Sequence, residues 1–474
     1  MHPIFSKLKS DIRVWIAVFF IAQLLFITQP PLESAHNWRQ SVTAMTARNM
    51  VQDSGTILQP RIDYGGSSRG IMATEFPLLQ TCISGFIRLF GPAHWYGRFI
   101  NLIFSCIGFW AFFKIAQWYV GNRAAFFGTL GLMVSLWLIY SRKIMPDTFA
   151  CSWILLAAWW YIKFAFERKN AFLVLALLAG MLGVLSKIPA VLLFSFCTPI
   201  LISSSTSVSR KLAVVAALMA TAVPVYWWYF VWSPHLVAID NNPLFFPRTF
   251  LIGLEELARY PNEIIQQFVF RSFFAYSGFV LAAIGIGICI YQKRIKVLTM
   301  LLTAFVLMFY FMTKVGEVFP FHSYYMVPFV PFLALTLGVC LASIKHRGLL
   351  YFLCLFLLVE SLVNQLDDFH PKPSTKSLLE LEDVADAIAP RSEKIVCNGG
   401  LNPQLIYFIN RKGWSLRDAE LSNERLESCK AEGAKYLFFY RYTNKGKQKK
   451  LPKFNYPILF ENDFVIVFSL NPSS

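Results

Sequence analysis

Residues 99–119 read FINLIFSCIGFWAFFKIAQWY, an apolar stretch with one charged residue, Lys114. A stretch of about 17–25 such residues is a candidate membrane-spanning helix. Ten more lie near 12–29, 124–140, 148–166, 171–186, 188–203, 212–232, 272–291, 297–312, 323–343 and 348–364. The sequence therefore predicts an α-helical polytopic membrane protein with about eleven transmembrane helices. The stretches 171–186 and 188–203 adjoin at Lys187-Ile188-Pro189 and could instead form one broken helix.

The composition agrees with this class. Of the 474 residues, 56% are hydrophobic and 15% are charged, whereas soluble globular chains are about 45–50% apolar and about 25% charged. A disordered protein, a small disulfide scaffold and an ordinary soluble enzyme are excluded. The net charge of +17 first suggests a nucleic-acid partner, but the low charged fraction argues against one.

The positive charge is concentrated on one side of the predicted helices. The acids on that side are Asp11 and Glu167, and the fifteen bases are Lys7, Lys9, Arg13, Lys114, Arg123, Lys163, Arg168, Lys169, Arg210, Lys211, Lys293, Arg294, Lys296, Lys345 and Arg347. Short basic loops stay in the cytoplasm. The N-terminus is therefore expected inside and, after eleven spans, the tail outside. Because this charge lies in short cytoplasmic turns, we expect no nucleic-acid partner.

The tail has a different composition from the rest of the chain. It follows a Pro-rich entry at 370–373 and contains a helix-like run, Leu378–Ile388, and three strand-like runs, Ile395–Cys397, Tyr436–Tyr440 and Phe464–Phe468. The sequence predicts a multispan domain at 1–364 and a small extracytoplasmic α/β domain at 365–474. Cys397 and Cys429 could pair if that compartment is oxidising.

The first outward loop, residues 30–98, is unusually rich in charged and aromatic residues. It contains six arginines and the acids Glu33, Asp53, Asp63 and Glu75. It could be an ordinary solvated loop, or it could be folded over the membrane as a functional site. Long loops without regular structure are usually functional or disordered, and this one is too apolar to be disordered. Its length favours a site.

Several short motifs on the predicted outer side resemble those of one enzyme family. They are Ala47-Arg48-Asn49-Met50, Phe76-Pro77-Leu78-Leu79, Gly97-Arg98-Phe99, Ser141–Asp147, Leu185–Pro189 and the run from His322 to Pro331. Their order and spacing resemble the polyprenyl-phosphate-sugar-dependent glycosyltransferases of the GT-C fold. These include glycosyltransferase family 39, the protein O-mannosyltransferases and the lipid A aminoarabinose transferase.

The chain departs from the common pattern of this family in one place. The family's first loop begins with Asp-Glu where this chain has Arg39-Gln40, and the lipid A transferases have a base where this chain has Glu75. We interpret this as an exchange of charge within one site. The Trp-Arg-Gln and Glu-Phe-Pro pattern resembles a bacterial branch of the family. The exchange leaves open which carboxylate acts in catalysis.

The resemblance implies an inverting membrane glycosyltransferase, with the donor a polyprenyl-phosphate sugar and the acceptor an envelope lipid, glycan or protein. Such a reaction needs a group that takes the acceptor's hydroxyl proton and cations that stabilise the leaving phosphate. We expect the base to be Glu75, with Asp63, Glu33 and His36 as alternatives. The expected donor-binding residues are Arg39, Gln40, Arg98, Arg142, Asp147, Lys187, His322 and Tyr325. A divalent cation is possible, but no ligand spacing demands one. The expected location is a bacterial inner membrane.

Each candidate also has a purely structural interpretation. Glu75 could form a salt bridge with Arg69 or Arg39, Arg98 could extend to the membrane interface, and Asp147 could favour a helix N-terminus. His36 could serve only as a hydrogen-bonded structural residue, and His322 with its neighbouring tyrosines could form an interfacial belt.

Two other function classes fit part of the sequence. A flippase or transporter would place ionisable residues near the membrane midplane and often shows inverted repeats. Here the charges cluster in outward loops and no internal symmetry is visible, which favours surface chemistry. A related envelope polymerase or ligase would use a lipid diphosphate donor instead.

Overall fold

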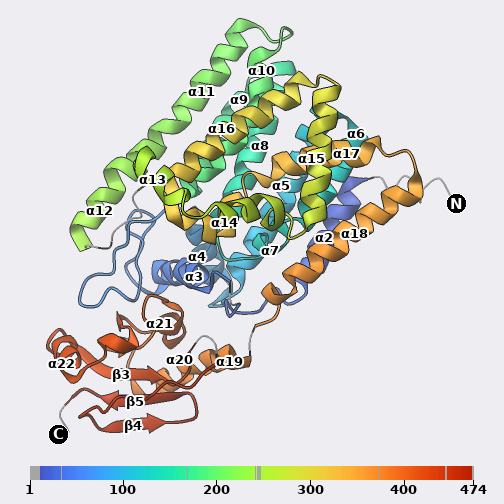
Figure 1. Ribbon diagram of the computed structural model, residues 1–474. Helices are drawn as coiled ribbons and strands as arrows, with labels where there is room; N and C mark the ends of the chain where they lie inside the picture. The colour runs from blue at the N-terminus through green and yellow to red at the C-terminus, as the bar shows by residue number, and fades with distance from the viewer. Residues whose placement is uncertain are drawn as a thin grey trace. The chain divides into compact units, whose positions relative to one another are not determined.

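The computed structural model describes residues 11–33, 35–167, 169–240, 242, 247–371, 373–443 and 446–471. It is mostly helical, with one small sheet near the C-terminus (Figure 1). The contacts divide the chain into two compact units. Unit 1 contains the described residues of Met1–Ile27, Arg98–Phe230 and Phe245–Leu366, and unit 2 contains those of Thr28–Gly97, Val231–Leu244 and Asp367–Ser474.

Unit 1 consists of helices. Its α-helices are α2 (Ile12–Leu24), α5 (Tyr96–Val120), α6 (Asn122–Val134), α7 (Trp137–Tyr140), α8 (Pro146–Glu167), α9 (Ala171–Ser186), α10 (Thr198–Ile202), α11 (Val208–Tyr226), α13 (Phe250–Leu257), α14 (Pro261–Gln266), α15 (Tyr276–Tyr291), α16 (Ile295–Val315), α17 (Val330–Ser343) and α18 (Arg347–Gln365). Tighter or wider turns occupy η1 (Ile188–Cys197), η2 (Trp227–Trp232), η3 (Gln267–Arg271), η4 (Gly316–Phe321), η5 (Ser323–Met326) and η6 (Leu366–Asp368).

Within the described ranges, five helices are long and apolar enough to cross a membrane, or six if one bent pair counts as a span. The five are Tyr96–Val120, Pro146–Glu167, Val208–Asp240, Ile295–Phe321 and Arg347–Asp368, and the pair is Pro261–Arg271 with Tyr276–Tyr291. All six coincide with predicted stretches. The other five stretches form shorter helices, so the expected count of eleven full spans is not confirmed.

The backbone explains where the shorter helices end. α9 stops at Ser186 because Lys187 is extended, with φ −163° and ψ 110°. Pro189 lies at the start of the next segment, which is a 3-10 helix rather than a continuation of α9. Pro189 also has no backbone N–H to donate to the carbonyl four residues earlier, so the hydrogen-bond pattern of an α-helix cannot continue through it. The alternative of a broken helix at Lys187-Ile188-Pro189 therefore describes this segment well.

Glycines allow the helices at the centre of unit 1 to approach closely. α17 packs against both α6 and α15. A Cβ atom on Gly338 of α17 would lie 2.2 Å from the Ala124 carbonyl of α6, and one on Gly285 of α15 would lie 1.9 Å from the Thr336 carbonyl of α17. Small residues at helix interfaces are typical of membrane proteins. This packing holds α17 almost completely buried.

Unit 2 contains the predicted α/β tail. Its sheet has the order β2-β1-β3-β5-β4, in which β1 is parallel to β2 and β3, and β5 is antiparallel to β3 and β4. The strands are β1 (Lys394–Cys397), β2 (Gly413–Ser415), β3 (Ala434–Tyr440), β4 (Ile458–Glu461) and β5 (Val465–Ser469). The accompanying helices are α19 (Pro373–Lys376), η7 (Ser377–Glu380), α20 (Leu381–Ile388), α21 (Gln404–Ile409), η8 (Asp418–Glu420) and α22 (Asn423–Ala431). The three expected strands and the expected helix are confirmed, while β2 and β4 were not predicted.

The first outward loop is folded and belongs to the same unit as the tail. It forms α3 (Asn37–Gln52) and α4 (Leu78–Phe90), and α12 (Ser233–Asp240) also belongs to this unit. Residues 63–66 lie next to the start of β2, because Gly413 donates a hydrogen bond to the Asp63 carbonyl and accepts one from the Gly66 amide, both at 2.8 Å. The interpretation of residues 30–98 as a structured region fits this arrangement.

The cysteines do not form disulfides. All nine are free, including Cys397 in β1 and Cys429 in α22, which are both buried. Burial raises the pKa of the Cys397 thiol to about 11. Both thiols therefore act as small apolar groups in the tail, and the pairing considered from the sequence is absent.

Candidate functional site

The start of α3 gathers four of the candidate residues in unit 2. Arg39 forms an ion pair with Glu75, whose carboxylate also accepts a 2.8 Å hydrogen bond from the Thr74 hydroxyl. On the next residue of α3, the Gln40 amide donates to the Glu33 carboxylate over 3.3 Å. Two carboxylates and two donors therefore lie around the first turn of one helix, which agrees with the salt bridge considered for Glu75.

Solvent access distinguishes these carboxylates. The side chains of Glu75 and Arg39 retain 16% and 13% of their exposure, whereas Glu33 and Asp63 are only 3% and 4% exposed. A general base must reach the proton that it takes. Of the three acids expected from the sequence, Glu75 is the one most accessible to another molecule.

His36 lies immediately before α3. Its backbone is left-handed, with φ 59°, and its carbonyl accepts the first helical hydrogen bond from the Gln40 amide at 3.1 Å. Such backbone is uncommon for residues other than glycine. The position fixes where α3 begins and therefore the direction of Arg39 and Gln40.

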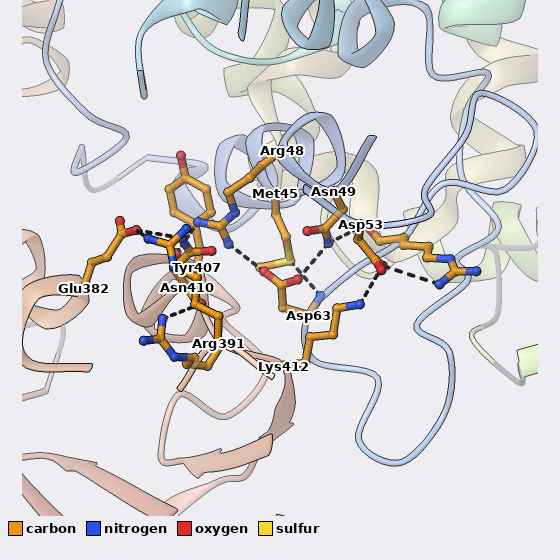
Figure 2. Close-up of polar contacts among 12 residues, drawn as sticks. Met45, Arg48, Asn49, Asp53, Asp63, Glu382, Arg391, Tyr407, Asn410 and Lys412 are labelled. Carbon is orange, nitrogen blue, oxygen red and sulfur yellow. Dashed lines mark hydrogen bonds and ion pairs between the residues drawn. The ribbon is translucent and has the colours of Figure 1, made fainter. Parts of the chain in front are cut away.

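Asp63 belongs to a different cluster, in which it joins the loop to α3 (Figure 2). Its carboxylate accepts hydrogen bonds from Arg48 at 2.6 Å and from Asn49 at 2.7 Å. Arg48 also donates to the Tyr407 carbonyl at 2.9 Å. Its guanidinium lies 4.8 Å from the centre of the Tyr407 ring. This geometry gives Asp63 a structural task within unit 2.

In unit 1, Arg98 and Arg142 lie in direct contact. Arg98 is completely buried near the start of α5 and donates to the Arg142 carbonyl over 3.2 Å. The guanidinium of Arg142 donates to the carbonyls of Leu25 and Phe26, at 3.1 and 2.9 Å. Arg98 therefore holds the backbone of the segment that carries Arg142, and it is not a side chain that extends to a membrane interface.

The segment around Arg142 is held by Asn101, which the sequence analysis did not single out. The Asn101 amide group donates to the carbonyls of Tyr140, Lys143 and Met145, at 3.1, 2.7 and 3.1 Å. Its oxygen accepts a 2.9 Å hydrogen bond from Thr148. An Asn in the interior of a long apolar stretch, three residues after Arg98, was the available signal. Lys143, which is also almost fully buried, was missed too.

Asp147 and Lys187 form a second charged pair in unit 1. Asp147 lies in the first turn of α8, and its carboxylate is 3.7 Å from the Lys187 ammonium. That ammonium lies 5.3 Å from the ring centre of Tyr324. Tyr324 in turn contacts both His322 and Tyr325, with ring centres 5.3 and 4.4 Å away. The structure thus joins Asp147, Lys187, His322 and Tyr325 through one aromatic cluster.

The described residues contain no group of three or more His, Cys, Asp or Glu side chains close enough to hold a metal ion. The donors described around Glu33 and Glu75 are the Gln40 amide, the Arg39 guanidinium and the Thr74 hydroxyl. A role for a divalent ion stays a prediction from the sequence.

Comparison with known proteins supports the resemblance seen in the sequence. Residues 75–229 match the family model of the dolichyl-phosphate-mannose-protein mannosyltransferases. This range includes Glu75, Arg98, Arg142, Asp147 and Lys187. No curated protein matches the chain.

Among solved structures, ArnT from Cupriavidus metallidurans bound to undecaprenyl phosphate has a TM-score of 0.60 at 12% identity, over 96% of this chain and 98% of that one. The apo form of the same protein gives 0.60 at 13% identity, over 97% and 98%. The oligosaccharyltransferase AglB from Archaeoglobus fulgidus, in complex with an inhibitory peptide and a dolichol-phosphate, gives 0.54 at 10% identity, over 90% and 69%. The chain therefore has the GT-C fold, and it is similar over residues 75–229 to the dolichyl-phosphate-mannose-protein mannosyltransferases.

Proposed function

We propose that the chain is a membrane glycosyltransferase that transfers a sugar from a polyprenyl-phosphate donor to an acceptor on the outer face of the membrane. The GT-C fold supports this, because the similar ArnT and AglB structures contain undecaprenyl phosphate and a dolichol-phosphate. The observation that carries the proposal is the ion pair of Arg39 and Glu75 at the start of α3, a partly exposed carboxylate next to a guanidinium.

Glu75 acts as the general base in this proposal. The acceptor hydroxyl attacks the anomeric carbon of the donor sugar while Glu75 takes its proton. The bond from that carbon to the phosphate oxygen breaks, and the electron pair leaves with the polyprenyl phosphate. A single displacement of this kind inverts the anomeric centre. Asp63 and Glu33 are less suited because they are nearly buried, whereas Glu75 is partly exposed.

Arg142 and Lys187 bind the donor phosphate in this proposal. The Arg142 guanidinium already donates to the Leu25 and Phe26 carbonyls, so in this proposal it stabilises the phosphate through its fixed positive charge. Lys187 adds a second positive charge. Arg98 acts through Arg142 by holding its backbone, so it is a positioning residue, and Asp147 orients Lys187. Donor contacts with the remaining expected residues belong to the same proposal: Arg39, Gln40, His322 and Tyr325.

Charge distribution supports the location. Fifteen bases lie in the predicted inward loops and the candidate residues lie in the predicted outward segments. We therefore place the N-terminus in the cytoplasm, the tail on the outer side and the protein in a bacterial inner membrane. This places the reaction where a nucleotide sugar is not required.

The test uses membranes that contain the full chain and undecaprenyl phosphate carrying glucose, mannose or aminoarabinose. Mass spectrometry measures free undecaprenyl phosphate and the glycosylated envelope components. Glu75→Gln should lower the release of undecaprenyl phosphate at least 1,000-fold without loss of inserted protein. Glu424 is an exposed residue of α22, and Glu424→Gln should release undecaprenyl phosphate at the normal rate. Substantial turnover by Glu75→Gln would contradict the base assignment, and no release by the parent chain from any donor would contradict the function.

A further inference from the structure

The sheet of the tail has a topological switch point. β1 continues through α21 to β2 on one side, and β2 continues through α22 to β3 on the other side of β1. The chain therefore leaves the carboxyl ends of β1 and β3 in opposite directions. In open α/β sheets, ligands bind in the crevice at such a point. Nothing in the proposed transfer chemistry uses this part of the protein.

Asn398 holds this end of the sheet apart. It directly follows β1 and is 3% exposed. Its side chain accepts a hydrogen bond from the Tyr440 amide at 2.8 Å and donates to the Tyr440 carbonyl at 2.9 Å. The Asn398 side chain thus takes the place of a backbone partner for β3 at Tyr440. As a result, β1 and β3 move apart at this end of the sheet. The same amide group also donates to Asp418 over 3.1 Å.

A cavity of about 290 Å³ lies at this place. Pockets for small molecules usually measure about 300–1,000 Å³, so the cavity has room for a small ligand such as one or two sugar rings. It is lined by the loops that follow β1, β2 and β3, through Asn398, Gly400, Arg417, Asp418, Tyr440 and Tyr442. Gly400 has φ +63°, a backbone conformation that glycine adopts without strain.

The chemistry of the lining fits a carbohydrate. Amide, carboxylate and ammonium groups offer both donors and acceptors, and sugar hydroxyls need both. The Lys449 ammonium lies 3.1 Å from the Asp418 carboxylate, so the lining places groups of opposite charge side by side. Tyr440 and Tyr442 add two aromatic rings whose centres are 6.2 Å apart. A prenyl chain would remove these charged and polar groups from water and offer them no hydrogen bonds in return, which is costly.

The same cavity is connected to the start of α3. Its wall includes Asn402 and Gln404. The Gln404 side chain accepts a 2.9 Å hydrogen bond from Asn37 and donates to the Pro31 carbonyl at 2.8 Å. Asn37 is the first residue of α3, two positions before Arg39. The cavity and the Arg39–Glu75 pair therefore belong to unit 2. The first turn of α3 connects them, since Asn37 contacts the cavity wall and Arg39 forms the ion pair.

We propose that this cavity binds a sugar unit of the acceptor, which makes the acceptor a glycan or a glycolipid. The proposal rests on the transferase function above and adds a substrate class to it. Asp418 and Lys449 bind the hydroxyl groups, and Tyr442 contacts the face of the sugar ring.

The binding test uses the full chain in lipid nanodiscs and saturation-transfer NMR with glucose, galactose, mannose and N-acetylglucosamine. At least one sugar should bind, and Tyr442→Ala and Asp418→Asn should each weaken its binding at least 10-fold. Glu427→Gln is the matched control, because Glu427 also pairs with a lysine, Lys430 at 3.4 Å, but on α22 outside the cavity. This control should bind like the parent chain. Binding of none of the sugars, or equal binding by all variants, would overturn the proposal.

A second measurement separates this inference from the proposed function. Glu75→Gln should bind the sugar normally although it transfers none. In the transfer reaction, Tyr442→Ala should raise the acceptor KM at least 10-fold while kcat stays within 2-fold. If the parent chain transfers sugar and Tyr442→Ala leaves the acceptor KM unchanged, the acceptor site is refuted and the transferase function stands. If sugars bind but no donor is consumed, the transferase function fails and the acceptor role with it.

Discussion

Arg48 and Asp63 form a buried ion pair in which a guanidinium nitrogen lies 2.6 Å from a carboxylate oxygen. Arg48 comes from the middle of α3, and Asp63 lies at the edge of the tail's sheet, where its carbonyl accepts from Gly413. The pair therefore ties α3 to the sheet inside unit 2. This arrangement supports a structural role for Asp63 and is one reason why the proposed base is Glu75.

Asp63→Ala should destabilise unit 2 by about 3–5 kcal/mol, because it leaves the Arg48 charge buried without its partner. Thermal unfolding of the purified chain in detergent should show the loss as a lower midpoint. Asp53→Ala is the comparison, because Asp53 pairs with Lys412 at 2.6 Å nearer the surface. Exposed pairs contribute about 0–1 kcal/mol. Equal effects of the two substitutions would show that the Asp63 pair is not the buried tie inferred here.

The sequence predicted Glu75 and Asp63 as rivals because a linear pattern shows only that both are acids in one loop. The two hydrogen bonds of Arg48 are the reason that the proposal prefers Glu75 to Asp63, and one of these bonds joins residues 359 positions apart. No local pattern contains a contact of that range. The long helices α5, α8, α16 and α18 could be predicted, since a long apolar run depends only on its own residues. The short ones could not be counted as spans, since a single extended residue such as Lys187 ends α9.

Arg142→Lys should raise the KM for the donor at least 10-fold and leave the acceptor KM unchanged. Lysine keeps the charge but lacks the planar guanidinium that donates to the Leu25 and Phe26 carbonyls, so the charge loses its fixed position beside the phosphate. Initial rates at varied donor and acceptor concentrations separate the two constants. Arg210→Lys provides the control, because Arg210 also donates to a backbone carbonyl, that of Phe164, in a predicted cytoplasmic segment. A parallel rise in both constants would indicate a general structural defect in place of a donor contact.

Asn101→Ala should remove the support of the Arg142 segment. The carbonyls of Lys143 and Met145 lose the Asn101 donor, whereas that of Tyr140 still accepts from Thr148 at 2.9 Å. A buried group left unsatisfied costs about 1–3 kcal/mol. We expect a lower unfolding midpoint together with a higher KM for the donor, as predicted for Arg142→Lys. Asn364→Ala is closely matched, because Asn364 also donates to two carbonyls, at 2.9 and 3.0 Å, but is exposed to its surroundings. If both variants behave alike, the 140–145 segment does not depend on Asn101.

Asn101 also shows why part of the site was not predicted. In the sequence it is one polar residue inside an apolar helix, and the default interpretation of such a helix is a lipid-facing span. Its function depends on the return of the chain at 140–145, after helix α7 ends, where the carbonyls of Tyr140, Lys143 and Met145 accept from it. The sequence motif Ser141–Asp147 identified that return, but not the side chain that holds it.

Unit 2 should lose stability as the pH falls below about 6.5. His94 is partly buried and hydrogen bonds to the Tyr407 hydroxyl at 2.7 Å. Burial, aided by the nearby charge of Arg48, lowers the pKa of His94 below its ordinary value, which is about 6.5 in an unfolded chain. Between the folded and the unfolded pKa, the unfolded state binds the additional proton, so stability rises with pH in that window and is lost as the pH falls through it.

Unfolding midpoints from pH 8 to pH 5 should decline more in the parent chain than in His94→Gln, whose side chain does not titrate. His370, outside the folded elements of the tail, supplies the control His370→Gln, which should retain the full decline. Identical profiles for the parent chain and His94→Gln would assign the pH dependence to other groups.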